Sequence, residues 1–185
     1  MNKHILKLFV VLILSLALFA CKTTPNKYPT YQEAVANWKS YHDVADWLNN
    51  NFYFSWSRVS HAQKQGLVRQ PKNLYNIKKG YCIDAALFAQ RALNKINPEY
   101  KASLIYIDNL EPNQNDHWVT GFYEKGQLYV MDYGTGGGGW MSMRGVHGPY
   151  DSLDQYRNFL STLSIKTFTV GEVVWNDLPY RFMED

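Results

Sequence analysis

The sequence predicts an α+β domain in which helices come first and an antiparallel sheet follows. Up to residue 96, apolar side chains recur at three- and four-residue steps, which is the spacing of amphipathic helices. Beyond residue 100, short runs rich in β-branched and aromatic residues read as strands. Helical and strand patterns are thus separated along the chain, and this separation is typical of the α+β class.

The first expected helix covers residues 31–50. Thr30 and Glu33 fit a capping box at its start, and apolar residues continue at helical spacing as far as Phe52. The following segment, residues 53–70, has no decisive periodicity, and we assign it no element.

Two more helices are expected on either side of a glycine. Pro71, a residue favoured at the first position of a helix, opens a short helix through Ile77, which Gly80 ends. An alanine-rich helix then covers residues 82–95 and begins with Cys82.

The rest of the chain reads as sheet, interrupted by one helix. The expected elements are strands at 101–108, 116–124, 127–134 and 165–174 and a helix at 152–163. Lys125-Gly126, between the second and third of these strands, favours a tight hairpin. No internal repeat is present in the sequence.

The N-terminus has the pattern of an export signal. Lys3 and Lys7 form a positive region before an apolar run at residues 8–20, which is too short to cross a bilayer comfortably. The run ends in LFAC, which resembles the cleavage site of a bacterial lipoprotein with Cys21 as the residue to be lipidated. An ordinary secretory signal and an uncleaved anchor are the alternatives.

The lipoprotein interpretation divides the chain into three parts. Residues 1–20 would be the signal peptide, residues 21–30 a lipidated N-terminus with a polar tether, and residues 31–185 a single domain. Acyl chains such as palmitate on Cys21 would hold the protein to a membrane of the cell envelope. Lys22 stands where an aspartate would indicate retention in the inner membrane. We therefore expect the outer membrane, facing the periplasm, if the organism is Gram-negative.

The charge balance does not favour a nucleic acid as partner. The whole chain has 19 Lys and Arg against 16 Asp and Glu, a net charge of +3. Removal of residues 1–20 takes away two lysines and lowers the net charge to about +1. The sequence has no basic run and no cluster of zinc ligands. Its aromatic content of 16% fits a core rich in large rings, or a groove for a peptide or sugar.

Cys82 is the remaining cysteine once Cys21 is lipidated. In an oxidising compartment, an odd cysteine indicates an intermolecular disulfide or a free reactive thiol. A buried cysteine that acts only as a small apolar residue is the third possibility.

The position of Cys82 suits a nucleophile. The thiolate is the reactive form, and the N–H groups and dipole in the first turn of a helix stabilise an anion. Gly80 leaves room for the chain to turn into this helix. The helix also carries four small residues that allow a sheet to pack close to it, Ala85, Ala86, Ala89 and Ala92.

A thiol nucleophile needs a base, and His117 is the histidine on a strand expected to face this helix. The other histidines are in the signal, among polar helical neighbours or in segments without a pattern: His4, His42, His61 and His147. The alternative is that His117 is a structural residue beside Trp118.

The hairpin places a carboxylate near this histidine. If Lys125-Gly126 is a two-residue turn, Glu124 pairs with Gln127, and His117 and Asp132 become diagonal neighbours on one face. An acid in this place would orient the imidazole and support its protonated form.

The order Cys82, His117 and Asp132 resembles that of the transglutaminase-like branch of the papain-like fold. KKGYCIDAALF resembles the family's signature at the start of the central helix, and DHWVTGFYEKGQLYVMDYG resembles its histidine strand, turn and aspartate strand. This resemblance covers residues 71–135 and implies a papain-like core, with the nucleophile helix packed on an antiparallel sheet. It further implies Cys82 as nucleophile, His117 as general base and acid, and Asp132 as the orienting acid. Asp84 matches a signature position, and we interpret it as a brace of the first helical turn.

A thiol enzyme also needs hydrogen-bond donors for the developing oxyanion. One should be the backbone N–H of Cys82. The second is usually an upstream side chain in this fold, and the candidates are Trp56 and Asn76.

Two further segments, one rich in glycine and one acidic, have compositions that bear on function. The glycine-rich segment 133–150 is either a mobile flap over the thiol, with Trp140 closing on substrate, or a plain crossover loop. It lacks the lysine and the context of a phosphate-binding loop. The acidic segment 108–116 lacks the spacing of a Ca²⁺ loop, and we interpret it as solvated. No metal and no cofactor is expected.

These observations predict a lipid-anchored thiol hydrolase that cleaves peptide or carboxamide bonds through a thioester. A peptide, a protein or a cell-wall peptide is the expected substrate. Attack by an amine in place of water would instead make the protein a crosslinking acyltransferase. The rival from another class is an inactive lipoprotein that binds a peptide or protein partner in an aromatic groove.

Overall fold

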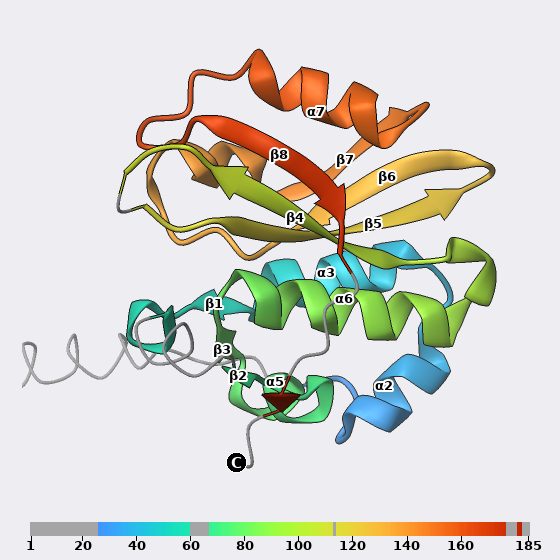
Figure 1. Ribbon diagram of the computed structural model, residues 1–185. Helices are drawn as coiled ribbons and strands as arrows, with labels where there is room; N and C mark the ends of the chain where they lie inside the picture. The colour runs from blue at the N-terminus through green and yellow to red at the C-terminus, as the bar shows by residue number, and fades with distance from the viewer. Residues whose placement is uncertain (1–25, 60–66, 113, 177–180, 183–185) are drawn as a thin grey trace, which may run out of the picture.

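The computed structural model describes residues 26–59, 67–112, 114–176 and 181–182, which form three layers (Figure 1). The lower layer holds the helices α2 (Tyr31–Asn37), α3 (Tyr41–Asn51), α5 (Pro71–Ile77) and α6 (Cys82–Ile96). The middle layer is a sheet of β4 (Ser103–Asn109), β5 (His117–Glu124), β6 (Gln127–Asp132), β7 (Gly145–Tyr150) and β8 (Val170–Trp175). The upper layer is α7 (Leu153–Ser161), so the predicted α+β class is confirmed.

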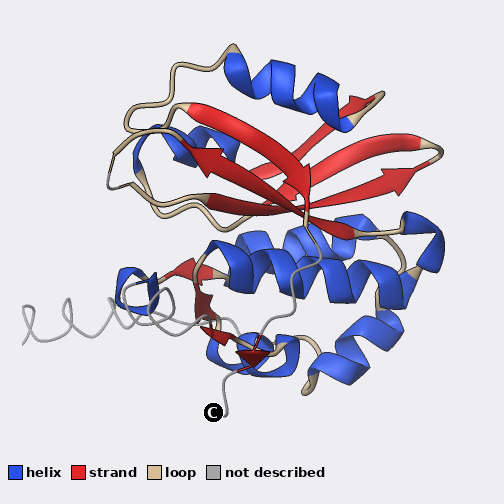
Figure 2. Ribbon diagram, in the orientation of Figure 1, coloured by secondary structure: helices blue, strands red, loops and turns tan. Residues whose placement is uncertain are grey.

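The five strands are antiparallel in the order β7-β6-β5-β4-β8. Figure 2 shows this sheet as a twisted red layer between blue helices. Two short parallel pairs lie outside it: β1 (Tyr53–Phe54) with β3 (Lys79–Gly80), and β2 (Leu67–Val68) with β9 (Arg181–Phe182). Two 3₁₀ helices, η2 (Pro98–Tyr100) and η3 (Gly138–Met143), complete the described elements. Within these described residues, every helix is too short or too polar to cross a membrane.

The predicted single helix over residues 31–50 is wrong, because the chain forms α2 and α3 instead. Thr30 caps α2 as expected, accepting the N–H of Glu33 at 3.2 Å. A second capping signal stands inside the predicted span: the Asp43 carboxylate accepts the N–H of Ser40 at 3.0 Å. A helix start at Ser40 requires an extended residue there, and this interrupts the helix although the apolar spacing continues.

The predicted helix from Pro71 to Ile77 is confirmed, but its end has a different cause. Lys78 adopts the left-handed conformation that terminates α5, with φ of 59°. Gly80 is needed two residues later for space, because a Cβ there would lie 2.9 Å from the Asp84 side chain. The predicted helix at 82–95 is confirmed as α6.

The predicted hairpin is confirmed together with its register. Lys125 and Gly126 have φ of 53° and 82°, as a two-residue turn of type I′ requires. Pairing runs from Glu124 opposite Gln127 to Thr120 opposite Met131.

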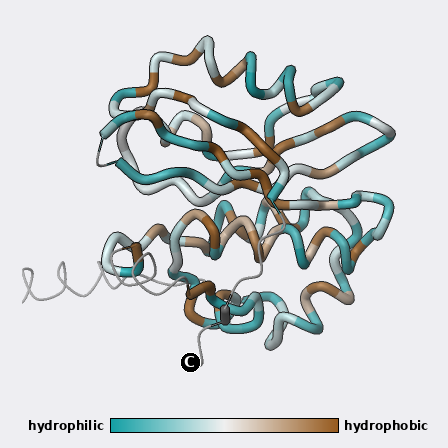
Figure 3. Tube along the Cα trace, viewed as in Figure 1, coloured by the Kyte–Doolittle hydropathy of each residue, from teal (hydrophilic) through white to brown (hydrophobic). Residues whose placement is uncertain are grey.

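The two faces of the sheet pack against different helices. On the lower face, the Thr120 hydroxyl donates to the Ala86 carbonyl of α6 at 2.6 Å, and Phe122 joins the core formed with α2, α3 and α6. On the upper face, Val119 and Val130 pack with the buried residues of α7. Figure 3 shows brown apolar stretches along α6 and along the strands above it. Both faces of this sheet are therefore buried.

The segment 133–150, expected as a loop throughout, contains η3 and β7. Sequence patterns hide β7 because Pro149 and two glycines, Gly145 and Gly148, lower its β propensity. The structure accommodates them because β7 is an edge strand, where a proline does not break a central hydrogen-bond ladder. The last strand begins later than predicted, at Val170.

Candidate active site

The N-terminus of α6, the start of β5 and the end of β6 meet at one end of the sheet, on the left of Figure 1. A cavity of about 300 Å³ opens there. Its lining includes Trp56, Cys82, His117, Trp118, Gly134 and Trp140. The structure thus brings Cys82 and His117 to the same cavity, with Asp132 directly behind His117.

His117 and Asp132 form a buried hydrogen-bonded pair. Nε2 of His117 lies 2.8 Å from Oδ2 of Asp132, and the residues are 6% and 1% exposed. Burial alone would lower the pKa of His117, but the charge of Asp132, its hydrogen bond and the Cys82 thiol raise it from 6.5 to about 10. The pair therefore favours an imidazolium at neutral pH.

Cys82 and His117 line the same cavity. The Cys82 thiol is one of the groups that raise the pKa of His117. Because Nε2 is engaged by Asp132, Nδ1 is the ring nitrogen left to exchange a proton with the thiol. Cys82 is also the first residue of the 15-residue helix α6, where backbone N–H groups and the helix dipole stabilise a thiolate.

Asp84 braces the turn that carries Cys82, as the sequence predicted. Its side chain is fully buried and accepts the backbone N–H of Tyr81 at 3.1 Å and that of Arg69 at 2.7 Å. It also forms an ion pair with Arg58, whose Nε lies 3.2 Å from Oδ2. These bonds connect the first turn of α6 to the segment around β2.

Gly134 is a site residue that the sequence analysis did not single out. A Cβ at this position would lie only 2.4 Å from Cα of Cys82. The chain after β6 therefore passes directly against Cys82, and only a glycine permits this approach. A glycine two residues after an expected catalytic acid was the available signal.

Trp140 is packed into the site instead of standing over its opening. Its Nε1 donates to Oδ2 of Asp132 at 2.9 Å, and its ring meets the His117 ring edge-to-face at 4.7 Å. Its other contact is with Phe168, at 4.4 Å between ring centroids. The side chain is 7% exposed, so the expected closing flap has a buried, hydrogen-bonded tryptophan at its centre.

The two oxyanion candidates lie in different places. Trp56 lines the cavity, is 63% exposed and meets Phe54 edge-to-face at 4.9 Å. Asn76 is an exposed residue of α5 and is not among the residues that line the cavity. Trp56 is therefore the candidate that the fold brings to the thiol.

The other predicted residues contribute little to this site. His42 is exposed on α3, and His147 is bonded to the Met143 carbonyl at 2.6 Å. The expected lipidation site Cys21 lies outside the described residues, as do His4 and His61.

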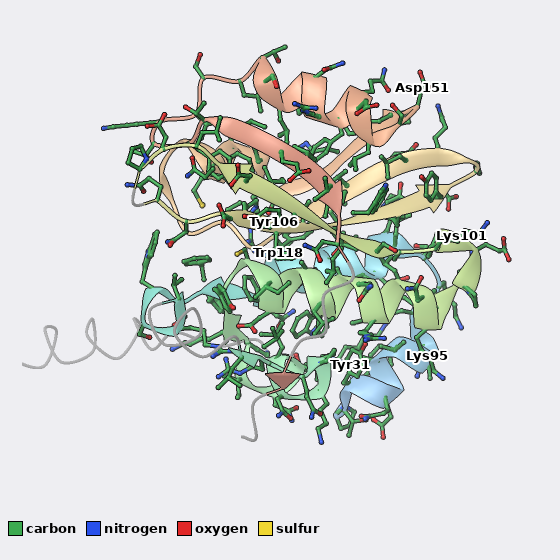
Figure 4. The ribbon with its side chains drawn as sticks, in the orientation of Figure 1. Tyr31, Lys95, Lys101, Tyr106, Trp118 and Asp151 are labelled. Atoms are coloured by element: carbon green, nitrogen blue, oxygen red, sulfur yellow. The ribbon has the colours of Figure 1, made fainter. Side chains whose placement is uncertain are left out.

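The cavity combines aromatic and polar walls. Trp118 is stacked obliquely on Tyr106 at 5.1 Å, and both lie between β4 and α6 in Figure 4. The lining also includes Asn109, Gln114 and Asn115. The Asp116 carboxylate accepts the N–H of Asn109 at 3.1 Å, so the acidic segment is internally bonded at this point. In the parts of the chain described, no group of His, Cys, Asp and Glu side chains could hold a metal ion.

Neither protein-family models nor curated proteins match this sequence. The site is accordingly interpreted from its own geometry.

Proposed function

We propose that the chain is a thiol hydrolase with a transglutaminase-like, papain-like core, acting on peptide or carboxamide bonds. The observation that carries this proposal is the arrangement of three groups at one end of the sheet. Cys82 lines the same cavity as His117, and Nε2 of His117 lies 2.8 Å from Oδ2 of Asp132. A nucleophile, a base and an orienting acid in this order are the minimum for covalent catalysis of acyl transfer.

The proposed reaction has two halves. The Cys82 thiolate attacks the carbonyl carbon, and the backbone N–H of Cys82 stabilises the oxyanion, with the Trp56 indole as second donor. The carbon–nitrogen bond then breaks, and the imidazolium of His117 gives its proton to the leaving amine. Water attacks the resulting thioester, His117 accepts a proton from it, and the carboxylic acid leaves as the thiolate is restored.

The cavity supports a substrate with both apolar and amide groups. Trp56 and Trp118 offer aromatic surface, and the side-chain amide of Gln114, which also lines the cavity, offers a donor and an acceptor for peptide amides. We infer that the acyl side of the substrate is a peptide, and a cell-wall peptide fits an enzyme anchored to the envelope by Cys21.

The first test measures the reactivity of Cys82. We would use the full chain in detergent, with Cys21→Ser so that Cys82 is the only thiol, and follow carbamidomethylation by iodoacetamide against pH. His117→Ala should slow the reaction at pH 6.5 by about tenfold or more, because the thiolate loses the imidazolium that stabilises it. The matched control is His42→Ala, an exposed histidine of α3, which should react as the parent does.

The second test measures turnover. The parent should release amine or ammonia from a set of fluorogenic peptides and carboxamides, and Cys82→Ser should not. Incorporation of a fluorescent primary amine instead would indicate acyl transfer. If His117→Ala and His42→Ala react alike and no substrate turns over, the hydrolase is refuted. The aromatic cavity would then be assigned to binding a peptide or protein partner.

A further inference from the structure

We infer that Trp140 is a positioning residue that acts through Asp132 to keep its carboxylate directed at His117. The inference rests on the proposed function, because it assigns Trp140 a part in the Cys82–His117–Asp132 arrangement. It gives the glycine-rich segment a task different from that of a flap.

The side chains of His117 and Trp140 bond the same oxygen of Asp132. Oδ2 of Asp132 accepts from Nε2 of His117 at 2.8 Å and from Nε1 of Trp140 at 2.9 Å. Oδ1 of the same carboxylate is buried with no hydrogen-bond partner among the described residues. Without the indole N–H, the His117 ring would be the one described donor left to orient the carboxylate. The indole N–H therefore holds the carboxylate in the orientation in which Oδ2 faces the histidine.

The indole ring of Trp140 also packs against two neighbouring rings. The ring meets His117 edge-to-face and lies against Phe168, so it closes one side of the His117–Asp132 hydrogen bond. Water excluded from this side cannot compete for Oδ2, and the local electrostatic interaction is stronger as a result.

The segment that carries Trp140 is itself bonded to neighbouring elements. Arg144 follows η3 directly, and its guanidinium donates to the Tyr133 carbonyl at 2.7 Å and to the Leu48 carbonyl at 3.0 Å. The chain that follows η3 is thus bonded to the residue after β6 and to the last turn of α3. Trp140 is held as part of the site's framework.

The test compares two tryptophan variants in the Cys21→Ser chain. Trp140→Phe keeps an aromatic ring but removes the N–H that reaches Asp132. The matched control is Trp47→Phe, because Trp47 is also 7% exposed and its Nε1 donates to Asn26 at 3.2 Å, away from the cavity. We expect Trp140→Phe to slow alkylation of Cys82 at pH 6.5 by about fivefold to tenfold, the size of one charge-assisted hydrogen bond partly lost. Its rate profile should reach half-maximum at higher pH, whereas Trp47→Phe should leave the profile in place.

A double-mutant cycle separates positioning from general packing. If Trp140 acts through Asp132, Trp140→Phe should change the rate less than twofold in an Asp132→Ala background. Asp132→Asn replaces Asp132→Ala if the alanine variant does not fold, as judged by circular dichroism. An unchanged profile in Trp140→Phe, an equal effect of Trp47→Phe, or a persistent effect without Asp132 would each overturn the inference. Failure of the proposed function looks different, because His117→Ala itself would then leave the alkylation rate unchanged.

Discussion

His117 carries two opposing electrostatic effects, and their balance has a consequence for folding. Burial lowers its pKa, while the charge and hydrogen bond of Asp132 raise it, to about 10 overall. The folded chain therefore holds a proton that the unfolded chain, with an ordinary histidine pKa of 6.5, releases. The resulting stabilisation is complete below about pH 6.5 and is lost as the pH rises through about 10.

This sign predicts how the effect of Asp132→Asn changes with pH. The variant should lower the free energy of unfolding strongly at pH 6 and less at pH 10, because a His117 with a pKa of about 10 is about half deprotonated there and most of its stabilisation is lost. The difference between the two effects should be at least about 1.4 kcal/mol, the equivalent of one pKa unit. Urea unfolding at both pH values measures it. The control is Asp154→Asn, an exposed residue in the first turn of α7, whose effect should be equal at both pH values. Equal effects of Asp132→Asn would show that the pair is not coupled.

Gly134 is the second residue whose surroundings make a quantitative prediction. In Gly134→Ala the new Cβ would meet Cα of Cys82 at 2.4 Å, and backbone on either side must move. We expect a loss of about 2 kcal/mol in the free energy of unfolding from overpacking, together with slower alkylation of Cys82.

The control for this clash is Gly171→Ala. Its Cβ would also lie 2.4 Å from the nearest atom, but that atom is Oδ2 of the Asp108 side chain, which can rotate away. This variant should therefore unfold within about 0.5 kcal/mol of the wild type. If Gly134→Ala is equally mild, the close passage of the chain over Cys82 is not as the structure has it.

At the scale of elements, the first turn of α6 depends on a buried ion pair. Asp84 is fully buried and bonded to Arg58 and to two backbone N–H groups. Asp84→Asn would leave the Arg58 guanidinium buried without a charge partner, which costs about 3–5 kcal/mol. In Arg58→Met, by contrast, the carboxylate keeps its backbone donors, and we expect a smaller loss. Chemical denaturation of both variants tests this order.

The double variant Arg58→Met/Asp84→Asn tests whether the two charges act as a pair. It removes both charges, so its free energy of unfolding should fall by less than the sum of the two single losses. Additive losses would mean that the two side chains contribute independently. Because Cys82 belongs to the same turn, alkylation should slow most in Asp84→Asn.

The elements predicted well were those whose signal is local. The hairpin register followed from Lys125-Gly126 because both residues adopt the positive φ of a two-residue turn, and α6 followed from its spacing. The helix over 31–50 was predicted wrongly because the Ser40–Asp43 cap lies inside a continuous apolar pattern. β7 was missed because its position at the sheet edge, which no local pattern reveals, is what tolerates Pro149.

The candidate site divides in the same way. His117 and Asp132 could be paired from the alternation along one hairpin, and the structure joins them at 2.8 Å. Gly134 and Trp140 contact the site through packing between distant elements, which spacing along the chain does not encode. Asp84 was recognised as a brace, but its partner Arg58 lies 26 residues away and was not predicted.

For the whole molecule, the contacts of the first described residues constrain where the domain would sit. Asn26 accepts from Trp47 at 3.2 Å and donates to the Tyr75 carbonyl at 3.3 Å, and Tyr75 donates to the Tyr28 carbonyl at 2.7 Å. Asn26 and Tyr28, which belong to the segment expected as a tether, are therefore bonded to α3 and α5. If Cys21 is lipidated, residues 21–25 alone separate the lipid from the domain, a reach of at most about 18 Å.

The lipoprotein interpretation predicts that membrane attachment depends on the thiol of Cys21. In bacteria expressing the full chain, Cys21→Ser should abolish incorporation of labelled palmitate, and the mass of the purified protein should show an uncleaved N-terminus. Cys82→Ser provides the matched control, since it removes the other cysteine and should keep both the label and the cleavage. Several acyl chains together hold a protein firmly to a membrane. The wild type should therefore enter the detergent phase when it is partitioned with Triton X-114. Palmitate on Cys21→Ser would place the lipid on another residue, and an unlabelled wild type cleaved at another site would indicate an ordinary secretory signal. Either result would refute Cys21 as the anchor of the protein.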